Sequence, residues 1–491
     1  MLDRLIGQFD EPGTQIVIDH AYAYLVPDSK NESDVIEAVD AVTSWKDPGD
    51  YFAQRFSGRR FDTTHRLLSK KKLQFPTGLV PTVAQALEES GYSYQLHDNR
   101  TYPETVEEIR PLTDIELRGY QTEAVLEGLK SKRGVFSLPP GLGKTEIMIA
   151  LVNSLRAFPT LWLTHTRTLL EQTFERFKQR LEHQGISIGQ IGGGSWQPKD
   201  ITIATVQTLT HKANHKKVIE LLKPIQVIIS DEAHHTPSKT WFKLLCGCSA
   251  PFRFGCSATP LDRGDGSDLC LIGTAGDIIY ELTPMEAAEL GFIDVPKITF
   301  VEYMDGCNSA KEPYAGEVIW KELYEKYIVN ASLRNQAILD VCKHCVESDR
   351  RAIVLIRMIG HGKILEKELI RWFQTDAHVK FVWGTSSDAV RHEVVEAFKD
   401  GVVRVLIASS IFDEGADIPE IDAVVIAAAG KSAIKAMQRA GRGMRKSSEK
   451  QLLVFDFMDR AHPVLLKHSN ARRRVYRNRG FKDITTGRLG E

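Results

Sequence analysis

The hydrophobic positions of the chain fall into short runs separated by amphipathic stretches, and this alternation predicts the fold. In the first part of the pattern, apolar runs of strand length occur at residues 135–136, 161–163, 201–204, 227–229 and 252–254. Between two of these runs, Leu169, Leu170, Phe174 and Phe177 recur at helical spacing. Such alternation is typical of βαβ units, so we expect a parallel sheet with helices on both faces.

The same pattern then repeats in the second half of the chain. Five further apolar runs lie at residues 352–356, 381–383, 403–407, 423–426 and 452–455. A chain of 491 residues is too long for one hydrophobic core. We therefore predict two α/β domains, over residues 111–295 and 296–491.

The first 110 residues follow a different pattern. Apolar and polar positions alternate around residues 16–18, 22–26 and 92–96, and residues 81–91 have helical spacing. Alternation with period two is typical of half-buried strands. This segment is predicted to be a small α+β accessory domain over residues 1–110.

A glycine-rich turn follows the first apolar run of the α/β pattern. Its residues are Pro140, Gly141, Leu142, Gly143, Lys144 and Thr145. A turn of this kind between a strand and a helix binds phosphate through backbone N–H groups and the helix dipole. Lys144 is expected to reach the β- and γ-phosphates, and the Thr145 hydroxyl to hold Mg²⁺. Leu138 stands where the full motif has a glycine, but the rest of the motif is intact.

Two adjacent carboxylates follow the apolar run at 227–229. We expect Asp231 to hold the same Mg²⁺ as Thr145, and Glu232 to orient and deprotonate the attacking water. Taken alone, either motif could be a glycine turn or a surface acidic pair. Their occurrence in this order, each after an apolar run, predicts a site that hydrolyses a nucleoside triphosphate with ATP and Mg²⁺ as cofactors.

Composition narrows the protein class. The net charge is −1, so any nucleic-acid surface must come from local charge asymmetry. An odd number of cysteines, seven, favours reduced thiols and an intracellular protein. Cys342 and Cys345 have zinc-ligand spacing, but they lie in a helical pattern without a second pair, which favours buried thiols. The chain does not begin like a signal peptide, and no apolar run approaches the roughly 18 residues that predict a membrane span.

Several further segments carry the pattern of a known family, in the family's order. They are residues 117–121, 164–172, 204–209, 256–260, 413–419 and 438–445. With these motifs the chain resembles the superfamily 2 helicases and translocases from Leu117 to Phe481. The Asp231–His235 string, the 117–121 motif and residues 454–459 resemble the XPB-like and phage UvsW-type DNA helicases. The resemblance implies two tandem RecA-like parallel-sheet domains.

The resemblance also implies roles for individual residues. It places Gln121 on the adenine and Gly415 and Asp417 at the nucleotide. Strand contacts are implied for Thr164, Arg167, Thr205 and Gln207, and coupling of hydrolysis to movement for His234, Ser257 and Thr259. Gln438, Arg442 and Arg445 match the arginine-finger motif.

The arginine fingers have a physical rationale of their own. Phosphoryl transfer needs positive charge at the γ-phosphate, and Arg442 and Arg445 are three residues apart, so one helical face could present both. They belong to the second predicted domain, whereas Lys144 and Asp231 belong to the first. We therefore expect the site to be complete only when the two domains close on ATP. A solvated basic helix is the alternative interpretation.

Two local basic segments fit DNA. Residues 55–72 contain seven Lys or Arg against one acid, Asp62, and residues 467–482 contain seven and no acid. Clusters of this kind bind phosphate with release of counterions, although either could be only a solvated face. The residues of the first cluster expected to bind DNA are Arg59, Arg60, Lys70, Lys71 and Lys72.

The sequence therefore predicts an ATP-dependent DNA helicase or translocase that remodels branched DNA in recombination, repair or replication. We expect the protein to bind forked or branched DNA. Single-strand-binding or recombination proteins are the expected protein partners, and the cytoplasm of a bacterial or phage-infected cell is the expected location. The alternatives are an RNA helicase, the motor subunit of a restriction or defence system, and a nucleic-acid-binding scaffold with a decayed motor. Because the nucleotide motifs lie downstream, removal of residues 1–108 is expected to leave a folded ATPase.

Overall fold

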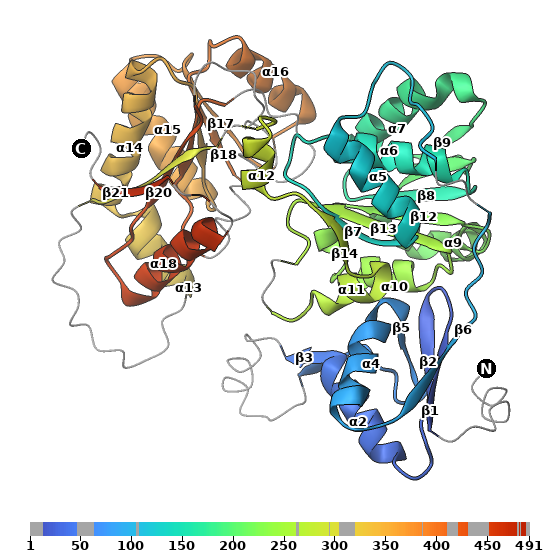
Figure 1. Cartoon of the computed structure of the whole chain (residues 1–491). Coiled ribbons are helices and arrows are strands. Elements are labelled where there is room, and N and C mark those ends of the chain that lie inside the picture. The colour runs from blue at the N-terminus through green and yellow to red at the C-terminus, as the bar shows by residue number, and fades with distance from the viewer. Residues whose placement is uncertain are drawn as a thin grey trace. The chain divides into compact units, whose positions relative to one another are not determined.

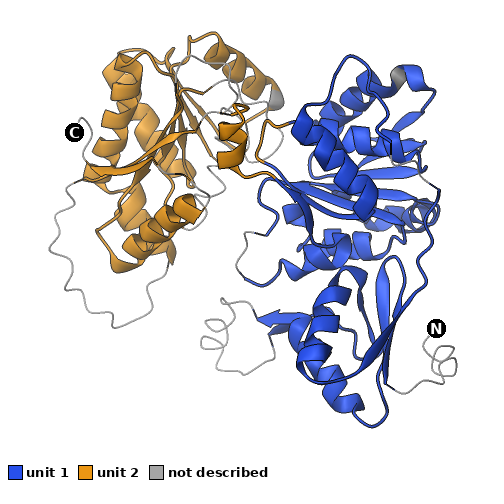
Figure 2. Cartoon of the chain, in the orientation of Figure 1, with its two compact units in different colours: residues 1–138, 143–281 blue, residues 139–142, 282–491 orange. Residues whose placement is uncertain are grey.

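The computed structural model divides into two compact units, which Figure 2 colours separately. One contains residues 1–138 and 143–281, and the other contains residues 139–142 and 282–491. The residues that the structure describes are 13–46, 63–104, 108–261, 265–293, 295–303, 320–384, 386–409, 421–430, 451–478, 481 and 483–487. The first unit holds both the N-terminal segment and the first α/β sheet, so the boundaries predicted at residues 110 and 295 stay predictions.

The N-terminal module, residues 13–104, is built on a four-stranded sheet in the order β5-β2-β1-β6 (Figure 1). The strands are β1 (Thr14–Ile18), β2 (Tyr22–Val26), β5 (Gln74–Pro76) and β6 (Tyr94–Asp98), with β3 (Ser44–Lys46) and β4 (Thr64–Arg66) forming a separate antiparallel pair. The helices are α2 (Glu32–Val42), α4 (Val80–Glu89) and the short η1 (Thr77–Leu79). The predicted α+β character is confirmed. The alternation predicted for β1 is wrong, since this central strand is buried along its whole length.

The first α/β domain contains an eight-stranded sheet in the order β10-β9-β11-β8-β12-β13-β7-β14. The strands are β7 (Arg133–Ser137), β8 (Thr160–Thr164), β9 (Ile188–Gly192), β10 (Ser195–Trp196), β11 (Ile201–Thr205), β12 (Val227–Asp231), β13 (Phe252–Ser257) and β14 (Ile278–Glu281). The helices are α5 (Gly119–Ser131), α6 (Lys144–Leu155), α7 (Arg167–Leu181), α8 (Val206–Thr210), α9 (His215–Leu222), α10 (Lys239–Cys246) and α11 (Leu269–Ala275). Only β10 pairs antiparallel, so the predicted parallel sheet is confirmed.

The second α/β domain contains a seven-stranded parallel sheet in the order β17-β18-β16-β19-β20-β15-β21. The strands are β15 (Lys297–Val301), β16 (Ala352–Leu355), β17 (Val379–Val382), β18 (Val405–Ala408), β19 (Ala423–Ile426), β20 (Leu453–Phe457) and β21 (Ile484–Gly487). The described helices are α12 (Pro284–Glu289), α13 (Trp320–Tyr324), α14 (Ser332–Glu347), α15 (Ile359–Phe373), α16 (Asp388–Lys399) and α18 (Pro463–Asn478). The predicted class of two tandem RecA-like parallel-sheet domains with an N-terminal α+β module is therefore confirmed.

Burial explains why the strands have continuous apolar runs. Strands β8, β11, β12 and β13 are buried at every position, because helices cover both faces of a parallel sheet. Cys342 and Cys345 lie fully buried in α14 as free thiols, as predicted. Within the described ranges no helix is long and apolar enough to cross a membrane.

Candidate nucleotide site and nucleic-acid interface

The glycine-rich turn lies between the end of β7 and the start of α6. Gly141 and Gly143 have φ values of 82° and 73°, a region that glycine adopts without steric cost. A Cβ atom at Gly143 would lie 2.5 Å from Nε2 of Gln121, so the predicted adenine contact packs directly against the turn. The Lys144 ammonium donates to the carbonyl of Leu138 at 3.1 Å. The turn therefore has the backbone form and the cation that phosphate binding requires.

The first carboxylate lies where β12 ends, beside the turn. Oδ1 of Asp231 accepts from the backbone N–H of Glu232 at 3.0 Å and from the thiol of Cys256 at 3.4 Å. Burial, followed by the charge of Glu232, raises the pKa of Asp231 to about 6, and Lys144 opposes this shift. A buried carboxylate and the Thr145 hydroxyl are oxygen ligands of the kind that Mg²⁺ takes. The residues present therefore fit the predicted ion, because a divalent cation would favour the ionised carboxylate.

The second carboxylate belongs to a residue with an uncommon backbone conformation. Glu232 has φ 51° and ψ 53°, the left-handed region that non-glycine residues seldom adopt. Its Oε2 lies 3.3 Å from Nδ1 of His234, and the same nitrogen lies 3.2 Å from Oγ of Ser257. Ser257 Oγ also accepts from the N–H of Thr259 at 3.2 Å. Because β12 and β13 are neighbours, the three predicted coupling residues form one chain of contacts that begins at Glu232.

The predicted strand-binding residues lie at the carboxyl ends of the adjacent strands β8 and β11. Arg167 and Gln207 have exposed side chains at the start of α7 and α8. Thr164 is fully buried and its hydroxyl donates to the carbonyl of Ala204 at 3.3 Å, while Thr205 Oγ1 lies 2.8 Å from Thr208 Oγ1. Arg167 and Gln207 are thus the members of this set that offer polar groups to a ligand.

A histidine stack joins the ends of β8 and β12 and was not foreseen from the sequence. The rings of His165, after β8, and His235, after β12, lie 4.3 Å apart and are inclined by 5°. Trp241 of α10 extends the stack, with ring centroids 5.9 Å from His235. The adjacency of β8 and β12 brings these residues together, and the sequence alone gives no sign of that pairing.

The first basic cluster is partly neutralised in the fold. Lys70, Lys71 and Lys72 are exposed in the turn before β5. Asp40 of α2, however, lies 2.8 Å from the Lys70 ammonium and 3.1 Å from Nε of Arg66. Lys71 and Lys72 are therefore the stronger of the described candidates for phosphate contact.

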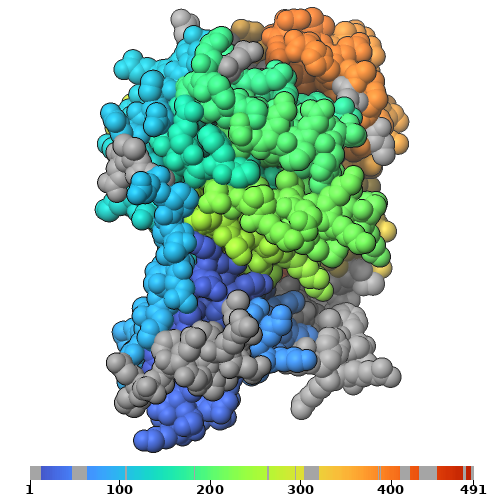
Figure 3. Space-filling model, turned by 90° about the vertical axis from the view of Figure 1, so that its right-hand side faces the viewer, coloured from blue at the N-terminus to red at the C-terminus, as the bar shows by residue number. Residues whose placement is uncertain are grey.

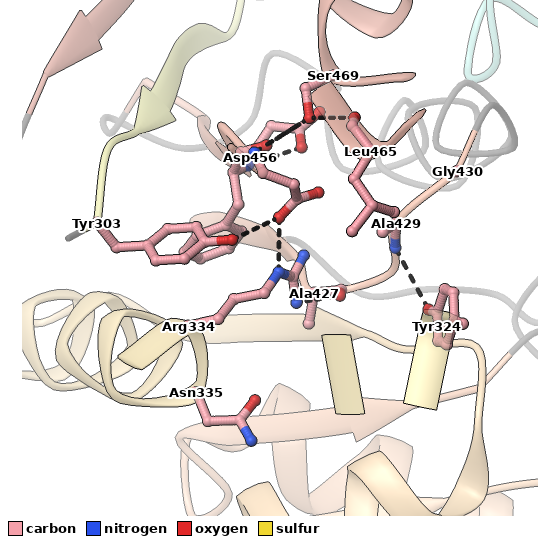
Figure 4. A network of polar contacts seen from close by, with 12 residues as sticks. Tyr303, Tyr324, Arg334, Asn335, Ala427, Ala429, Gly430, Asp456, Leu465 and Ser469 are labelled. Carbon is pink, nitrogen blue, oxygen red and sulfur yellow. Dashed lines mark hydrogen bonds and ion pairs between the residues drawn. The ribbon is translucent and has the colours of Figure 1, made fainter. Parts of the chain in front are cut away.

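The basic tail includes one residue that was assigned to the wrong environment. Arg472 of α18 is fully buried and donates to both carboxylate oxygens of Asp456, so it belongs to the core and cannot be part of a DNA-binding face. Figure 4 shows Asp456 and Arg334 in this polar network. Arg334 of α14 pairs in the same network with Asp459, at 2.7 Å. The two guanidinium groups also donate to the carbonyls of Ala427 and Gly430, the residues that follow β19.

Seven predicted site residues lie outside the described residues. They are Gly415 and Asp417 of the nucleotide set, Gln438, Arg442 and Arg445 of the finger motif, and Arg59 and Arg60 of the basic cluster. Their roles stay predictions. Gly430 immediately precedes the segment that contains the finger motif, so the buried network fixes the chain where that segment begins.

Two family models match the chain, and together they cover just over half of it. Residues 114–262 match the type III restriction enzyme, res subunit, and residues 334–447 match the helicase conserved C-terminal domain. The DNA 3'-5' translocase XPB2 of Sulfurisphaera tokodaii is 29% identical over 371 residues, which are 69% of this chain and 81% of the relative. The ATP-dependent DNA helicase uvsW of Enterobacteria phage T4 is 26% identical over 439 residues, 85% of this chain and 86% of the relative.

The solved structure of Saccharomyces cerevisiae Dbp5 bound to RNA and ADP BeF3 shares the fold alone. Its TM-score is 0.52 at 16% identity, over 75% of this chain and 89% of that chain. The two matched domains and the two relatives agree with the motif order and with the paired parallel sheets. The chain therefore resembles the superfamily 2 helicases, is similar to the DNA helicases XPB2 and UvsW, and is an ATP-dependent helicase, a hydrolase.

Proposed function

We propose that the protein uses ATP and Mg²⁺ to translocate on DNA and to remodel branched DNA. The observation that carries this proposal is that the N-terminal module, which carries the exposed lysines Lys71 and Lys72, and the first RecA-like domain form one compact unit. A motor that also holds a second DNA arm is suited to fork regression, Holliday-junction migration and D-loop dissociation. These reactions belong to recombination, repair and replication.

The nucleotide chemistry rests on the residues around the glycine-rich turn. Thr145 and Asp231 would hold Mg²⁺, which when bound supplies positive charge to the phosphates. Lys144 binds the β- and γ-phosphates, and Glu232 orients the attacking water and accepts its proton. Arg442 and Arg445 stabilise the charge on the transferred phosphoryl group. Gln438, Gly415 and Asp417 complete the nucleotide contacts from the second RecA-like domain.

Translocation along DNA depends on contacts that link the site of ATP hydrolysis to the residues at the carboxyl ends of the β-strands. The chain from Glu232 through His234 to Ser257 lets the state of the nucleotide change the coupling motif. Arg167 and Gln207 bind the backbone of one DNA strand, where amide and guanidinium groups contact phosphate without distinguishing bases. We therefore expect translocation without sequence specificity.

Branched DNA is the favoured substrate on energetic grounds. Each base-pair step that is opened costs a stack of about 1.4 kcal/mol, and a four-way junction recovers this cost by re-pairing behind the moving point. Simple unwinding of a duplex does not recover it. A motor with a second DNA-binding module therefore works against the smallest free-energy cost where base pairs re-form behind the junction as others open ahead of it.

The deciding experiment compares substrates at equal enzyme and ATP concentrations. ATPase rate and strand movement are measured with single-stranded DNA, linear duplex, forked DNA, four-way junctions and RNA. Efficient junction and fork movement with weak unwinding of a long tailed duplex is expected. Processive unwinding of the long duplex with junctions left intact would refute the remodelling role, and stimulation by RNA alone would favour an RNA helicase.

The match to a restriction-enzyme family model supports a second candidate, the motor of a restriction or defence system. Such a motor translocates on unbranched duplex. Equal ATPase stimulation by linear duplex and by four-way junctions would favour this candidate.

A further inference from the structure

Helix α11 belongs to two hydrophobic cores at once. It packs on β13 and β7 of the first RecA-like sheet, and its residues Leu269 and Ile272 pack into the core of the N-terminal module. The contact is close: a Cβ atom at Gly78 would clash with the carbonyl oxygen of Ile272, and one at Gly273 would lie 2.9 Å from Cβ of Pro76. Glycine on both sides lets the two backbones meet. The module is therefore seated directly on this helix. Figure 3 shows the blue N-terminal segment against the yellow-green surface of the first RecA-like domain.

Two arginines bind the carboxyl ends of the helices at this interface. Arg253, fully buried in β13, donates to the carbonyls of Leu245, Cys248 and Thr274, where α10 and α11 end. Arg133 of β7 donates to the carbonyl of Ala275 at 3.1 Å. Positive charge at helix C-termini satisfies carbonyl groups that have no partner within the helix.

The contacts of Arg133 extend into the N-terminal module. Arg133 also donates to the carbonyl of His20, between β1 and β2, at 3.4 Å. Tyr102, in the connecting segment, lies between the rings of His20 and Phe252, at centroid distances of 5.4 and 5.6 Å. The module is thus fixed to the motor domain by partly buried polar and aromatic contacts.

The segment that precedes α11 makes a second contact, with the two-stranded ribbon of β3 and β4. Gly266 has φ 86°, and a Cβ atom there would lie 2.6 Å from Cβ of Trp45. Trp45 in turn stacks on its cross-strand partner His65, with centroids 5.1 Å apart and planes inclined by 18°. Oδ1 of Asp265 accepts from the N–H and the hydroxyl of Ser267, which fixes the turn around Gly266.

This contact joins the ribbon to the coupling motif by a short path in the chain. Gly266 follows Ser257 by nine residues and Thr259 by seven. Ser257 is already linked through His234 to Glu232. Ser257 is therefore linked to the nucleotide site, and Gly266, nine residues later, contacts Trp45. Residues 262–264 between them lie outside the described residues.

Exposed cations lie in the ribbon and in the turn before β5, and Asp40 links the two by pairing with both Arg66 of β4 and Lys70. Lys46 lies at the end of β3, and Lys71 and Lys72 lie in the turn before β5. Cations on a rigid scaffold bind the phosphates of duplex DNA without reading bases. Trp45 is half-buried against Gly266, so its ring holds the ribbon in place while the lysines face solvent.

We propose that Trp45 is a positioning residue through which a DNA arm bound at Lys71 and Lys72 accelerates ATP turnover in the first RecA-like domain. The proposal rests on the proposed remodelling function. DNA at the lysines restrains the ribbon, the ribbon restrains Gly266 through Trp45, and the coupling motif is thereby held in the arrangement that favours hydrolysis. The coupling is reciprocal for binding, so a nucleotide analogue must change junction affinity by the factor by which the junction changes affinity for that analogue.

The test uses the full chain and compares Trp45→Leu, Trp45→Phe and the double variant Lys71→Ala, Lys72→Ala. ATPase kcat and KM are measured with single-stranded DNA and with a four-way junction, together with the junction Kd at several salt concentrations. For Trp45→Leu we expect normal turnover with single-stranded DNA, a normal junction Kd, and loss of junction stimulation by about fivefold or more in kcat. Trp45→Phe, which keeps a ring against Gly266, should restore the stimulation.

The lysine variant serves as the matched control. It should weaken junction binding, lower the salt slope by about 2 and lose the junction stimulation as well, because the DNA arm is no longer bound at the lysines. Wild-type junction stimulation in Trp45→Leu overturns the inference, and so does a junction Kd weakened as in the lysine variant, since Trp45 would then be a DNA contact. If the wild-type enzyme responds equally to single strands and junctions, the remodelling function itself fails and the inference fails with it.

Discussion

Arg472 and Asp456 form a fully buried ion pair that joins α18 to the end of β20. Nη2 and Nε of Arg472 donate to the two carboxylate oxygens at 2.8 and 2.9 Å, and neither side chain is accessible to solvent. The hydroxyl of Tyr476 donates to the same carboxylate at 3.1 Å. The adjacent pair of Arg334 and Asp459 belongs to the same network, so the positive charges of two arginines face the negative charges of two carboxylates.

Breaking this network should destabilise the second RecA-like domain. Asp456→Asn removes the hydrogen-bonded counter-charge of the buried Arg472 and leaves Asp459, at 3.6 Å, to face both arginines, which costs about 3–5 kcal/mol in the free energy of unfolding. The control is Glu302→Gln, which breaks the exposed pair with Arg460 and should cost less than about 1 kcal/mol. Denaturant unfolding of the two variants is the measurement, and equal midpoints would contradict the assignment.

The pH dependence of stability should include a contribution from His361. Burial, with a smaller effect of Arg334, lowers the pKa of His361 to about 3, and its Nε2 lies 2.8 Å from Oδ1 of Asn335. Above pH 6.5 the histidine is neutral in both folded and unfolded chains, so it contributes nothing to the pH dependence. Below that pH only the unfolded chain takes up the proton, and stability falls by about 1.4 kcal/mol per pH unit.

At pH 5 this loss amounts to roughly 2 kcal/mol. His361→Gln removes the titrating group and keeps a polar side chain beside Asn335. The difference in unfolding free energy between wild type and variant should therefore shift in favour of the variant between pH 7 and pH 5. A difference that stays constant over this range would contradict the prediction, because the folded and unfolded chains would then take up the same number of protons.

The nucleotide site predicts a loss of turnover without loss of DNA binding. Lys144→Ala removes the cation at the phosphates, and Glu232→Gln removes the base while keeping the shape of the side chain. Each variant should have no measurable ATPase activity, whereas DNA affinity should largely remain because the proposed strand contacts lie elsewhere. ATPase and DNA-binding titrations check this prediction, and near-normal turnover in either variant would exclude the site.

The finger motif predicts a large effect on kcat. Arg442→Ala should lower kcat by about 10³-fold or more, with a smaller loss of ATP affinity. Arg442→Lys should restore little, because an ammonium lacks the planar fork of the guanidinium. Steady-state kinetics of the two variants decide the question, and a fully active Arg442→Lys enzyme would contradict a finger role.

Removal of the N-terminal module should destabilise the first RecA-like domain, contrary to the expectation from motif positions alone. Deletion of residues 1–108 exposes Leu269 and Ile272 of α11 and removes the His20 acceptor of Arg133. Exposure of these two side chains costs roughly 3 kcal/mol or more. Thermal unfolding should show a lower Tm for the deletion and an unchanged Tm for the double variant Lys71→Ala, Lys72→Ala. A deletion variant with wild-type stability would show that the module is independent.

The sequence by itself determined the class of the fold and the composition of the nucleotide site. Buried parallel strands need unbroken apolar runs, so β7, β8, β11, β12 and β13 could be located from hydrophobicity alone. Phosphate binding needs glycines and a lysine that are consecutive in the chain, so the turn around Lys144 was also visible. Strands β9, β14, β15 and β21 and helix α2 were missed, because short or half-polar segments carry weak periodicity.

Only the tertiary structure decided which charged side chains are exposed to a ligand and which helices and strands pack against one another. Arg472 lies in a run of basic residues, and nothing local distinguishes it from a DNA contact, yet packing of α18 on the sheet buries it against Asp456. Asp40 likewise meets Arg66 and Lys70 from a different element. The seating of the N-terminal module on α11 depends on contacts across about two hundred residues, such as Pro76 with Gly273. The physical reason is that a motif made of consecutive residues can be recognised in the sequence. The pairing and desolvation of charged side chains, in contrast, depend on residues distant in the chain that only the fold brings into contact.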